Sequence, residues 1–289
     1  MVDFIGLGAQ KAGTSWVYAC LYEHPEICTP QKEIHFFSRD RYAKGKNWYE
    51  SQFNRCKKGL KRGEFSTSYL YTPGTAKKIV DMYPQAKLIA IIRNPIHRAY
   101  SQFRNAVKAG EIDKDTTFSS YIEHAPSALE QGNYAKQLSE YYEYYSPLQL
   151  LVLVYEDSRE DPLGFIQQIY RHIGVDDTFV PKMLKKFVNV ERTPRFVRLE
   201  RWMHRFAELG RKIGLDKVVW MIKRSGVTDL IRKINTEKNS QVIPEDSKGK
   251  PIDPEVKAKM QEYFKEDTRL LSGLVERNLT VEWGIDEKL

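Results

Sequence analysis

The sequence has few cysteines and no long apolar run. Its three cysteines, Cys20, Cys28 and Cys56, are odd in number, lack C-x-x-C spacing and have no histidines at zinc-finger spacing. This pattern predicts neither a disulfide framework nor a zinc site, so we expect a reducing, cytoplasmic compartment. No run of about 18 apolar residues occurs, and an apolar stretch begins too close to Met1 for a secretory leader. We expect a soluble chain, although one trimmed from a membrane-anchored parent would look the same.

Positive charge is concentrated in one segment. The formal net charge is +8, and residues 192–240 alone hold 13 lysines and arginines against 5 acidic residues. Nothing resembles an RNA-recognition fold, a zinc finger or a helix-turn-helix, so we expect no nucleic-acid partner. Apolar residues recur in this segment at helical spacing, which predicts a helical insertion. We interpret it as a lid over an acceptor site; a peripheral membrane contact and a plain packed core are the alternatives.

The remainder of the chain alternates between apolar strands and helices. Uniformly apolar runs, typical of parallel strands buried on both faces, lie at 3–7, 87–92 and 149–154. Helical patterns lie at 14–24, 75–83, 95–109, 134–145, 162–173 and 253–276. This alternation predicts an α/β fold with a doubly wound parallel sheet, helices on both faces, and a single domain over 1–289.

A glycine loop follows the first predicted strand. Gly8 and Gly13 have the spacing of the nucleotide-triphosphate loop, but Thr14 stands where that loop has lysine, and Lys11 lies inside the loop. Backbone N–H groups at the start of the next helix would hold phosphate oxygens. The alternative is a glycine turn that lets helix and strand pack closely.

Two further segments carry candidate chemistry. If the stretch 32–37 is extended, Glu33 and His35 project from one face as two proton-transfer groups; otherwise they are the polar side of a half-buried strand. Farther on, Arg93 ends a strand and Ser101 lies about two turns into the following helix. A guanidinium and a hydroxyl at those places can bind a phosphate monoester.

These motifs, in this order, resemble sulfotransferases that use 3′-phosphoadenosine 5′-phosphosulfate (PAPS). The loop K-x-G-T-[ST]-W resembles their 5′-phosphosulfate loop, and [KE]-E-[IV]-H-F-F resembles the heparan sulfate sulfotransferases and their bacterial relatives. R-[ND]-P-x-x-R-x-x-S resembles the 3′-phosphate site, and 247–251 resembles a late loop that closes over the cofactor. The resemblance implies a P-loop-NTPase-like sulfotransferase fold with these cofactor-binding residues: Gln10, Lys11, Ala12, Gly13, Thr14, Ser15, Trp16, Arg93, Ser101, Lys248, Gly249 and Lys250.

By the same resemblance Glu33 is the catalytic base, with His35 beside it or serving as the base instead. Lys11 would neutralise charge on the departing adenosine 3′,5′-bisphosphate, and no metal is required. Trp16 either stacks on adenine or belongs to the core. The family often has an aspartate where this chain has Ser38, and a lysine where it has Phe65.

Other functions stay open at this stage. A kinase or NTPase on the same scaffold would need a strand-end aspartate for magnesium, and only Asp157 fits. A non-catalytic nucleotide-binding protein that docks on membranes through 192–240 is the second alternative. The sequence does not identify the acceptor, which is a saccharide, a lipid or a small metabolite sulfated on oxygen or nitrogen. It does not predict the oligomeric state.

Overall fold

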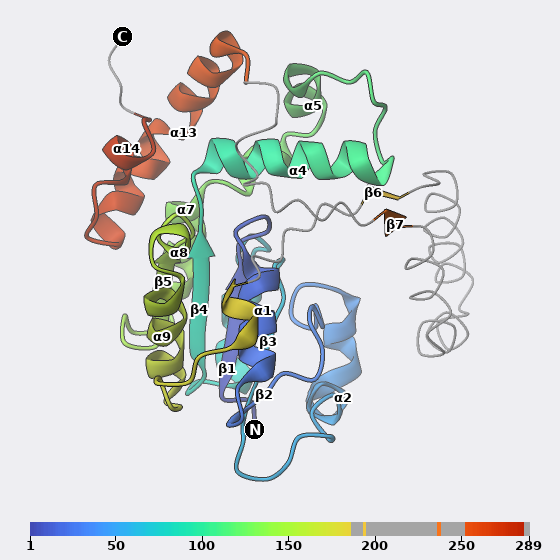
Figure 1. Ribbon diagram of the computed structural model, residues 1–289, viewed down its shortest axis with the longest axis vertical. Helices are drawn as coiled ribbons and strands as arrows, with labels where there is room; N and C mark the ends of the chain where they lie inside the picture. The colour runs from blue at the N-terminus through green and yellow to red at the C-terminus, as the bar shows by residue number, and fades with distance from the viewer. Residues whose placement is uncertain (186–192, 195–235, 238–251, 286–289) are drawn as a thin grey trace. The chain divides into compact units, whose positions relative to one another are not determined.

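The computed structural model describes residues 1–185, 193–194, 236–237 and 252–285 (Figure 1). The chain divides into two compact units. The first comprises 1–99, 125–188 and 252–289, and the second comprises 100–124 and 189–251. The expected single domain over 1–289 stays a prediction.

A five-stranded parallel sheet forms the centre of the first unit, in the order β2-β3-β1-β4-β5 (Figure 1). The strands are β1 (Phe4–Gly8), β2 (Ile27–Cys28), β3 (Lys61–Phe65), β4 (Lys87–Ile92) and β5 (Leu150–Val154). The chain adds β2 and β3 on one side of β1 and then β4 and β5 on the other. The predicted doubly wound α/β fold is confirmed, and ligands in such folds bind beyond the carboxyl ends of the strands next to the reversal.

The long helices begin and end close to the predicted positions. In the first unit they are α1 (Thr14–Glu23), α3 (Thr75–Met82), α7 (Tyr134–Tyr142), α9 (Pro162–Ile173) and α13 (Pro254–Leu274), with shorter α2 (Gly45–Ser51), α6 (Ser127–Glu130), α8 (Asp157–Glu160), α14 (Leu279–Glu282), η1 (Asp40–Lys44) and η2 (Lys182–Lys185). Helix α4 (Pro95–Ala109) begins in the first unit and continues in the second. The carboxylate of Asp253 accepts the backbone N–H of Glu255, as expected of an N-cap that precedes a first-turn proline.

Within the described ranges, no helix is both long and apolar enough to cross a bilayer.

The second unit contains α5 (Phe118–His124) and a two-stranded antiparallel ribbon of β6 (Thr193–Pro194) and β7 (Thr236–Glu237). Residues 193–194 and 236–237 of the predicted helical insertion are therefore extended and not helical, whereas the insertion itself stays a prediction. The predicted helices between the two strands lie outside the described residues.

The two strands of the five-stranded sheet that the sequence analysis missed are short or polar. β2 has two residues, and β3, with the sequence Lys-Arg-Gly-Glu-Phe, is buried only over Gly63–Phe65. Pairing with β1 forces β3 into the sheet, where the ring of Phe65 lies against Gly6; a Cβ added at Gly6 would come within 2.1 Å of that ring. Glycine at this position makes room for the phenylalanine.

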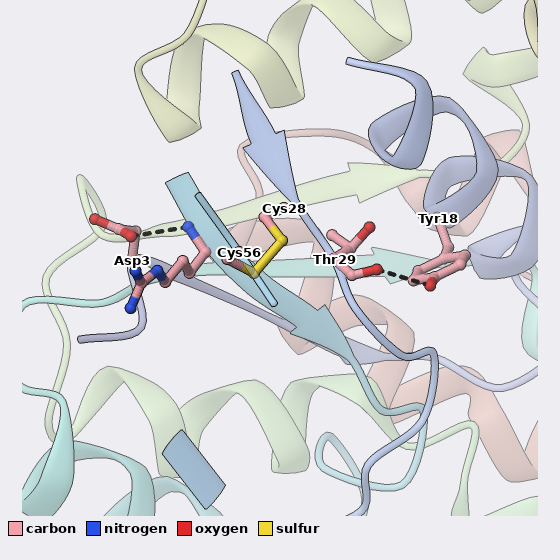
Figure 2. Close-up of a disulfide and its surroundings, with 6 residues drawn as sticks. Asp3, Tyr18, Cys28, Thr29 and Cys56 are labelled. Carbon is pink, nitrogen blue, oxygen red and sulfur yellow. Dashed lines mark hydrogen bonds between the residues drawn. A yellow bond between two sulfur atoms is a disulfide. The ribbon is translucent and has the colours of Figure 1, made fainter. Parts of the chain in front are cut away.

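A disulfide joins Cys28 to Cys56, contrary to the sequence prediction (Figure 2). The cysteine spacing gave no sign of it, because the pairing depends on the fold: Cys28 ends the edge strand β2, and Cys56 follows α2. Next to it, the hydroxyl of Tyr18 donates to the carbonyl of Thr29 at 2.9 Å. Cys20 is buried and not disulfide-bonded. The disulfide removes the argument from cysteine usage for a reducing compartment.

We expect the replacement of Cys28 and Cys56 by alanine to lower the free energy of unfolding by about 3 kcal/mol, because the bridge closes a long loop in the unfolded chain. Denaturant unfolding with and without reductant measures this: reductant should destabilise the parent chain and leave the double variant unchanged. Alkylation under non-reducing denaturing conditions should label Cys20 alone. Labelling of all three cysteines before reduction would contradict the bridge.

Candidate active site

The loop between β1 and α1 has the backbone of an anion cradle. Gly13, with a φ of 76°, precedes α1, and Lys11 also has a positive φ of 69°. The backbone N–H groups of Trp16 and Val17 both bond to the carbonyl of Gly13, so the helix starts immediately after the loop. Successive N–H groups in such a turn, at the positive end of a ten-residue helix, favour phosphate oxygens. The loop at residues 9–13 thus fits the predicted 5′-phosphate site.

Arg93 and Tyr155 hold this loop from the neighbouring strands. The guanidinium of Arg93, which is 2% exposed, donates to the carbonyl of Lys11 at 3.0 Å and lies 4.8 Å from the ring centroid of Tyr155. A Cβ on Gly13 would lie 2.7 Å from the Tyr155 ring, so only glycine fits there. Tyr155 was not predicted; its position directly after an apolar strand was the available signal. The structure therefore brings Arg93 and the predicted phosphate loop together.

The other predicted cofactor residues are placed as follows. Gln10 and Ala12 lie in the loop, and Thr14 and Ser15 begin α1. Trp16 is 3% exposed, packs on Phe165 and donates to the carbonyl of Met183, which favours the core alternative over adenine stacking.

Ser101 lies on α4 within the second unit, so its part in a 3′-phosphate site stays a prediction. Lys248, Gly249 and Lys250 lie outside the described residues.

Glu33 and His35 lie in an irregular loop, not in an extended strand. Both have left-handed backbone, with φ of 62° and 53°, and the N–H of Glu33 bonds to the carbonyl of Phe65 in β3. The adjacent Phe36 and Phe37 are both fully buried, which an alternating strand with one wet face does not allow. The expected proximity nevertheless occurs: His35 Nε2 lies 3.2 Å from Glu33 Oε2.

A chain of hydrogen bonds runs from Glu33 through His35. Because a carboxylate only accepts, we assign a hydrogen to His35 Nε2. His35 Nδ1 lies 2.6 Å from the hydroxyl of Ser68, which lies 2.6 Å from that of Ser38. With a neutral ring, Ser38 donates to Ser68, Ser68 donates to Nδ1, and Nε2–H donates to Glu33. Serine at position 38 therefore makes this relay end in a hydroxyl instead of a second carboxylate.

Lys32 connects the Glu33 loop to the phosphate loop. Its Nζ donates to the hydroxyl of Ser15 at 2.7 Å and lies 3.3 Å from Glu33 Oε1, which also accepts from Thr67 at 3.2 Å. Burial raises the pKa of Glu33, but the hydrogen bond from His35 and the charge of Lys32 outweigh it and lower that pKa to about 2. Glu33 is thus an ionised acceptor of protons beside the start of α1.

A buried carboxylate, Glu64, fixes the backbone of this loop. Glu64 is 0% exposed, and one of its oxygens accepts from the N–H of Ile34 and the hydroxyl of Ser66, at 3.3 and 2.6 Å. The other accepts from Tyr49 and Tyr69, at 3.1 and 2.5 Å. Ser66 in turn accepts the N–H of His35, and Tyr69 that of Phe36.

Four donors stabilise the ionised form of Glu64, yet burial raises its pKa overall. Sequence reasoning noticed the segment 64–69 only as a motif with a missing lysine. The polar run Glu-Phe-Ser-Thr-Ser-Tyr next to a predicted catalytic loop was the signal for a supporting network.

Cations and aromatic rings flank the same loop. Arg41 donates to the carbonyl of Ile34, and Lys78 donates to that of Phe37 at 3.3 Å. Lys78 also lies 5.1 Å from the ring centroid of Tyr42, and Lys44 lies 5.0 Å from that of Trp48, consistent with cation–π contacts. The ring of Trp48 stacks on that of Phe36 at 6.0 Å. The segment that follows Glu33, residues 34–37, is thus contacted by cations and by aromatic rings.

Comparison with known proteins agrees with this geometry. The family model of the sulfotransferase domain matches residues 2–191. Heparan sulfate glucosamine 3-O-sulfotransferase 3B1 of Mus musculus is 30% identical over 176 residues, covering 58% of this chain and 45% of that protein. Bifunctional heparan sulfate N-deacetylase/N-sulfotransferase 3 of Homo sapiens is 29% identical over 195 residues, covering 60% of this chain and 22% of that protein. The chain therefore spans less than half the length of these two relatives.

A solved structure supports the fold. The sulfotransferase from Alicyclobacillus acidocaldarius has a TM-score of 0.69 at 22% identity, with 98% of each chain covered. At this identity the likeness shows the fold alone. The family match covers well over half of the chain and includes the phosphate loop, Glu33 and Arg93. The chain belongs to the sulfotransferase domain family.

Proposed function

We propose that the protein transfers a sulfuryl group from PAPS to a hydroxyl or amine of an anionic saccharide, with Glu33 as the base. The observation that carries the proposal is the position of Glu33, whose carboxylate is linked through Lys32 to Ser15 at the start of α1. A base and an anion cradle at this separation suit a reaction between a bound phosphosulfate and an acceptor.

The donor is proposed from the fit of the loop to its phosphate. Backbone amides of residues 12–15 would hold the 5′-phosphate, and Lys11 would neutralise the charge on the departing oxygen. Arg93 fixes the loop through Lys11, and the resemblance assigns it to the 3′-phosphate together with Ser101. Bound PAPS would supply the sulfuryl group, and its 5′-phosphate would be the leaving group.

The chain's own residues would then handle the proton. As the acceptor oxygen or nitrogen forms its bond to sulfur, the bond from sulfur to the bridging oxygen breaks and its electron pair leaves with the bisphosphate. The proton of the acceptor passes to Glu33. His35 donates to Glu33 and orients it, backed by the Ser68 and Ser38 hydroxyls.

The acceptor class is proposed from the cations and rings beside the segment that follows Glu33. Arg41 contacts Ile34 of this segment, Lys78 and Lys44 add positive charge next to it, and Tyr42 and Trp48 add aromatic rings. A carboxylated or sulfated sugar satisfies both features. The two relatives described above are named for heparan sulfate, which agrees with this class.

The kinase alternative loses its magnesium ligand. Both carboxylate oxygens of Asp157 accept from the guanidinium of Arg277, at 2.6 and 2.8 Å. An aspartate engaged in this way is poorly suited to hold a metal ion. Docking on membranes through 192–240 has no observation in its favour, because only 193–194 and 236–237 of that segment are described.

The test is to incubate the protein with labelled PAPS and a panel of anionic saccharides, neutral saccharides, phenols, lipids and carrier-tethered intermediates. Calorimetry with adenosine 3′,5′-bisphosphate runs in parallel. We expect the bisphosphate to bind with a micromolar Kd, which corresponds to a binding free energy of about 8 kcal/mol. We also expect label on the anionic saccharides. Failure to bind the bisphosphate would overturn the donor, and label on neutral acceptors alone would overturn the acceptor class.

A further inference from the structure

The position at which the resemblance leads us to expect a second lysine holds a buried phenylalanine. Phe65 is 0% exposed, and its ring lies over Gly6 within the sheet. Its carbonyl nevertheless accepts the N–H of Glu33 at 2.8 Å, so position 65 adjoins the proposed base. Position 65 therefore contacts the backbone of Glu33 but supplies no positive charge there.

Lys32 occupies a place from which it could supply that charge. Its side chain is 26% exposed, and its Nζ lies 2.7 Å from Ser15 Oγ and 3.3 Å from Glu33 Oε1. An oxyanion bound by Ser15 would lie within one hydrogen bond of this ammonium. The same ammonium helps to lower the pKa of Glu33, beside the hydrogen bond that His35 donates to that carboxylate.

We propose that Lys32 is a second donor-binding cation that replaces the lysine missing at position 65, and that it exchanges Glu33 for the sulfuryl or 5′-phosphate oxygens when the donor binds. This inference rests on the proposed function and deepens it. The ammonium pairs with the Glu33 carboxylate in the free protein and would meet a polyanion in the complex. Charge-assisted hydrogen bonds to phosphosulfate oxygens therefore compete for it.

The exchange couples donor binding to the strength of the base. In the free protein burial raises the pKa of Glu33, but His35 and Lys32 outweigh it and keep that pKa low, and the Thr67 hydroxyl also donates to the carboxylate. Once Lys32 turns to the donor, Glu33 loses a positive neighbour and gains a negative one, and both changes raise its pKa. Glu33 thus becomes a better proton acceptor only when a sulfuryl group is present.

The experiment compares Lys32→Met and Lys32→Arg with the control Lys61→Met. Lys61 is also partly exposed and lies 3.9 Å from a carboxylate, that of Asp3, but it lies at the amino-terminal end of β3, whereas the phosphate loop follows the carboxyl-terminal end of β1. We expect Lys32→Met to weaken binding of adenosine 3′,5′-bisphosphate about tenfold and to lower kcat/KM about 100-fold. Lys32→Arg should recover most of both, and Lys61→Met should change neither.

The pH profiles separate a donor contact from a structural role. In the parent protein the acid limb of kcat, which reports the donor-bound enzyme, should lie at higher pH than that of kcat/KM, which reports the free enzyme. In Lys32→Met the acid limb of kcat/KM should move to higher pH, and the difference in pH between the acid limbs of kcat and kcat/KM should become smaller. If bisphosphate affinity and both limbs of Lys32→Met match the parent while transfer persists, this inference is wrong and the proposed function stands. If the parent itself binds no bisphosphate, the proposed function fails first.

Discussion

Glu33→Gln is expected to lower the rate of sulfuryl transfer by a factor of about 10³, because the amide cannot take the acceptor's proton. The amide keeps the shape of the side chain and one oxygen that accepts from His35 or Thr67. The loop should therefore stay folded, and kcat should fall more than substrate affinity. Single-turnover transfer from labelled PAPS measures the step directly.

Binding and folding controls make this result specific. Calorimetry should give Glu33→Gln a bisphosphate affinity within about threefold of the parent, because the phosphate loop is unchanged. Glu255→Gln is the matched control: Glu255 is exposed and pairs with Lys259 one turn later on α13, so its loss should not alter transfer. If Glu33→Gln keeps more than about a tenth of parental activity, Glu33 is not the base, and His35 becomes the candidate for that role.

The parts of the fold that the sequence predicted correctly are those with a local signal, one that a single segment shows without its neighbours in the fold. Uniformly apolar runs and N-terminal caps predicted β1, β4 and β5 and the long helices, since those signals are local. β3 could not be found this way, because Lys61 and Arg62 make half of it polar and its place in the sheet depends on pairing with β1. The disulfide was missed for the same reason: only the folded chain brings Cys28 to Cys56.

The candidate site shows the same division. Motif wording placed Lys11, Glu33, His35 and Arg93, and the structure brings Arg93 to the phosphate loop and His35 to Glu33. The motif did not predict the left-handed backbone at Glu33 and His35. That conformation is imposed by distant partners, above all the buried carboxylate of Glu64, which local periodicity cannot show.

Glu64→Ala is expected to be the most destabilising single change in the site, at about 4 kcal/mol of unfolding free energy. The substitution removes the common acceptor of Tyr49, Tyr69, Ser66 and the Ile34 N–H, all within the core. Buried donors left without an acceptor keep their full desolvation cost. Denaturant unfolding measures the loss, and a change below about 1 kcal/mol would show that the network does not hold the loop.

Glu64→Gln separates the charge of Glu64 from its shape. Because burial raises the pKa of Glu64, the folded protein binds its proton more tightly than the unfolded chain does. Stability from this group is therefore fully present below its ordinary pKa of 4.5 and falls as the pH rises toward the higher folded value. The parent should lose stability across that window, whereas Glu64→Gln, which cannot titrate, should lack this dependence. If both proteins lose stability equally in this pH range, a group other than Glu64 causes the loss. The hydrogen bonds from the four donors would then outweigh the effect of burial and keep the Glu64 carboxylate ionised.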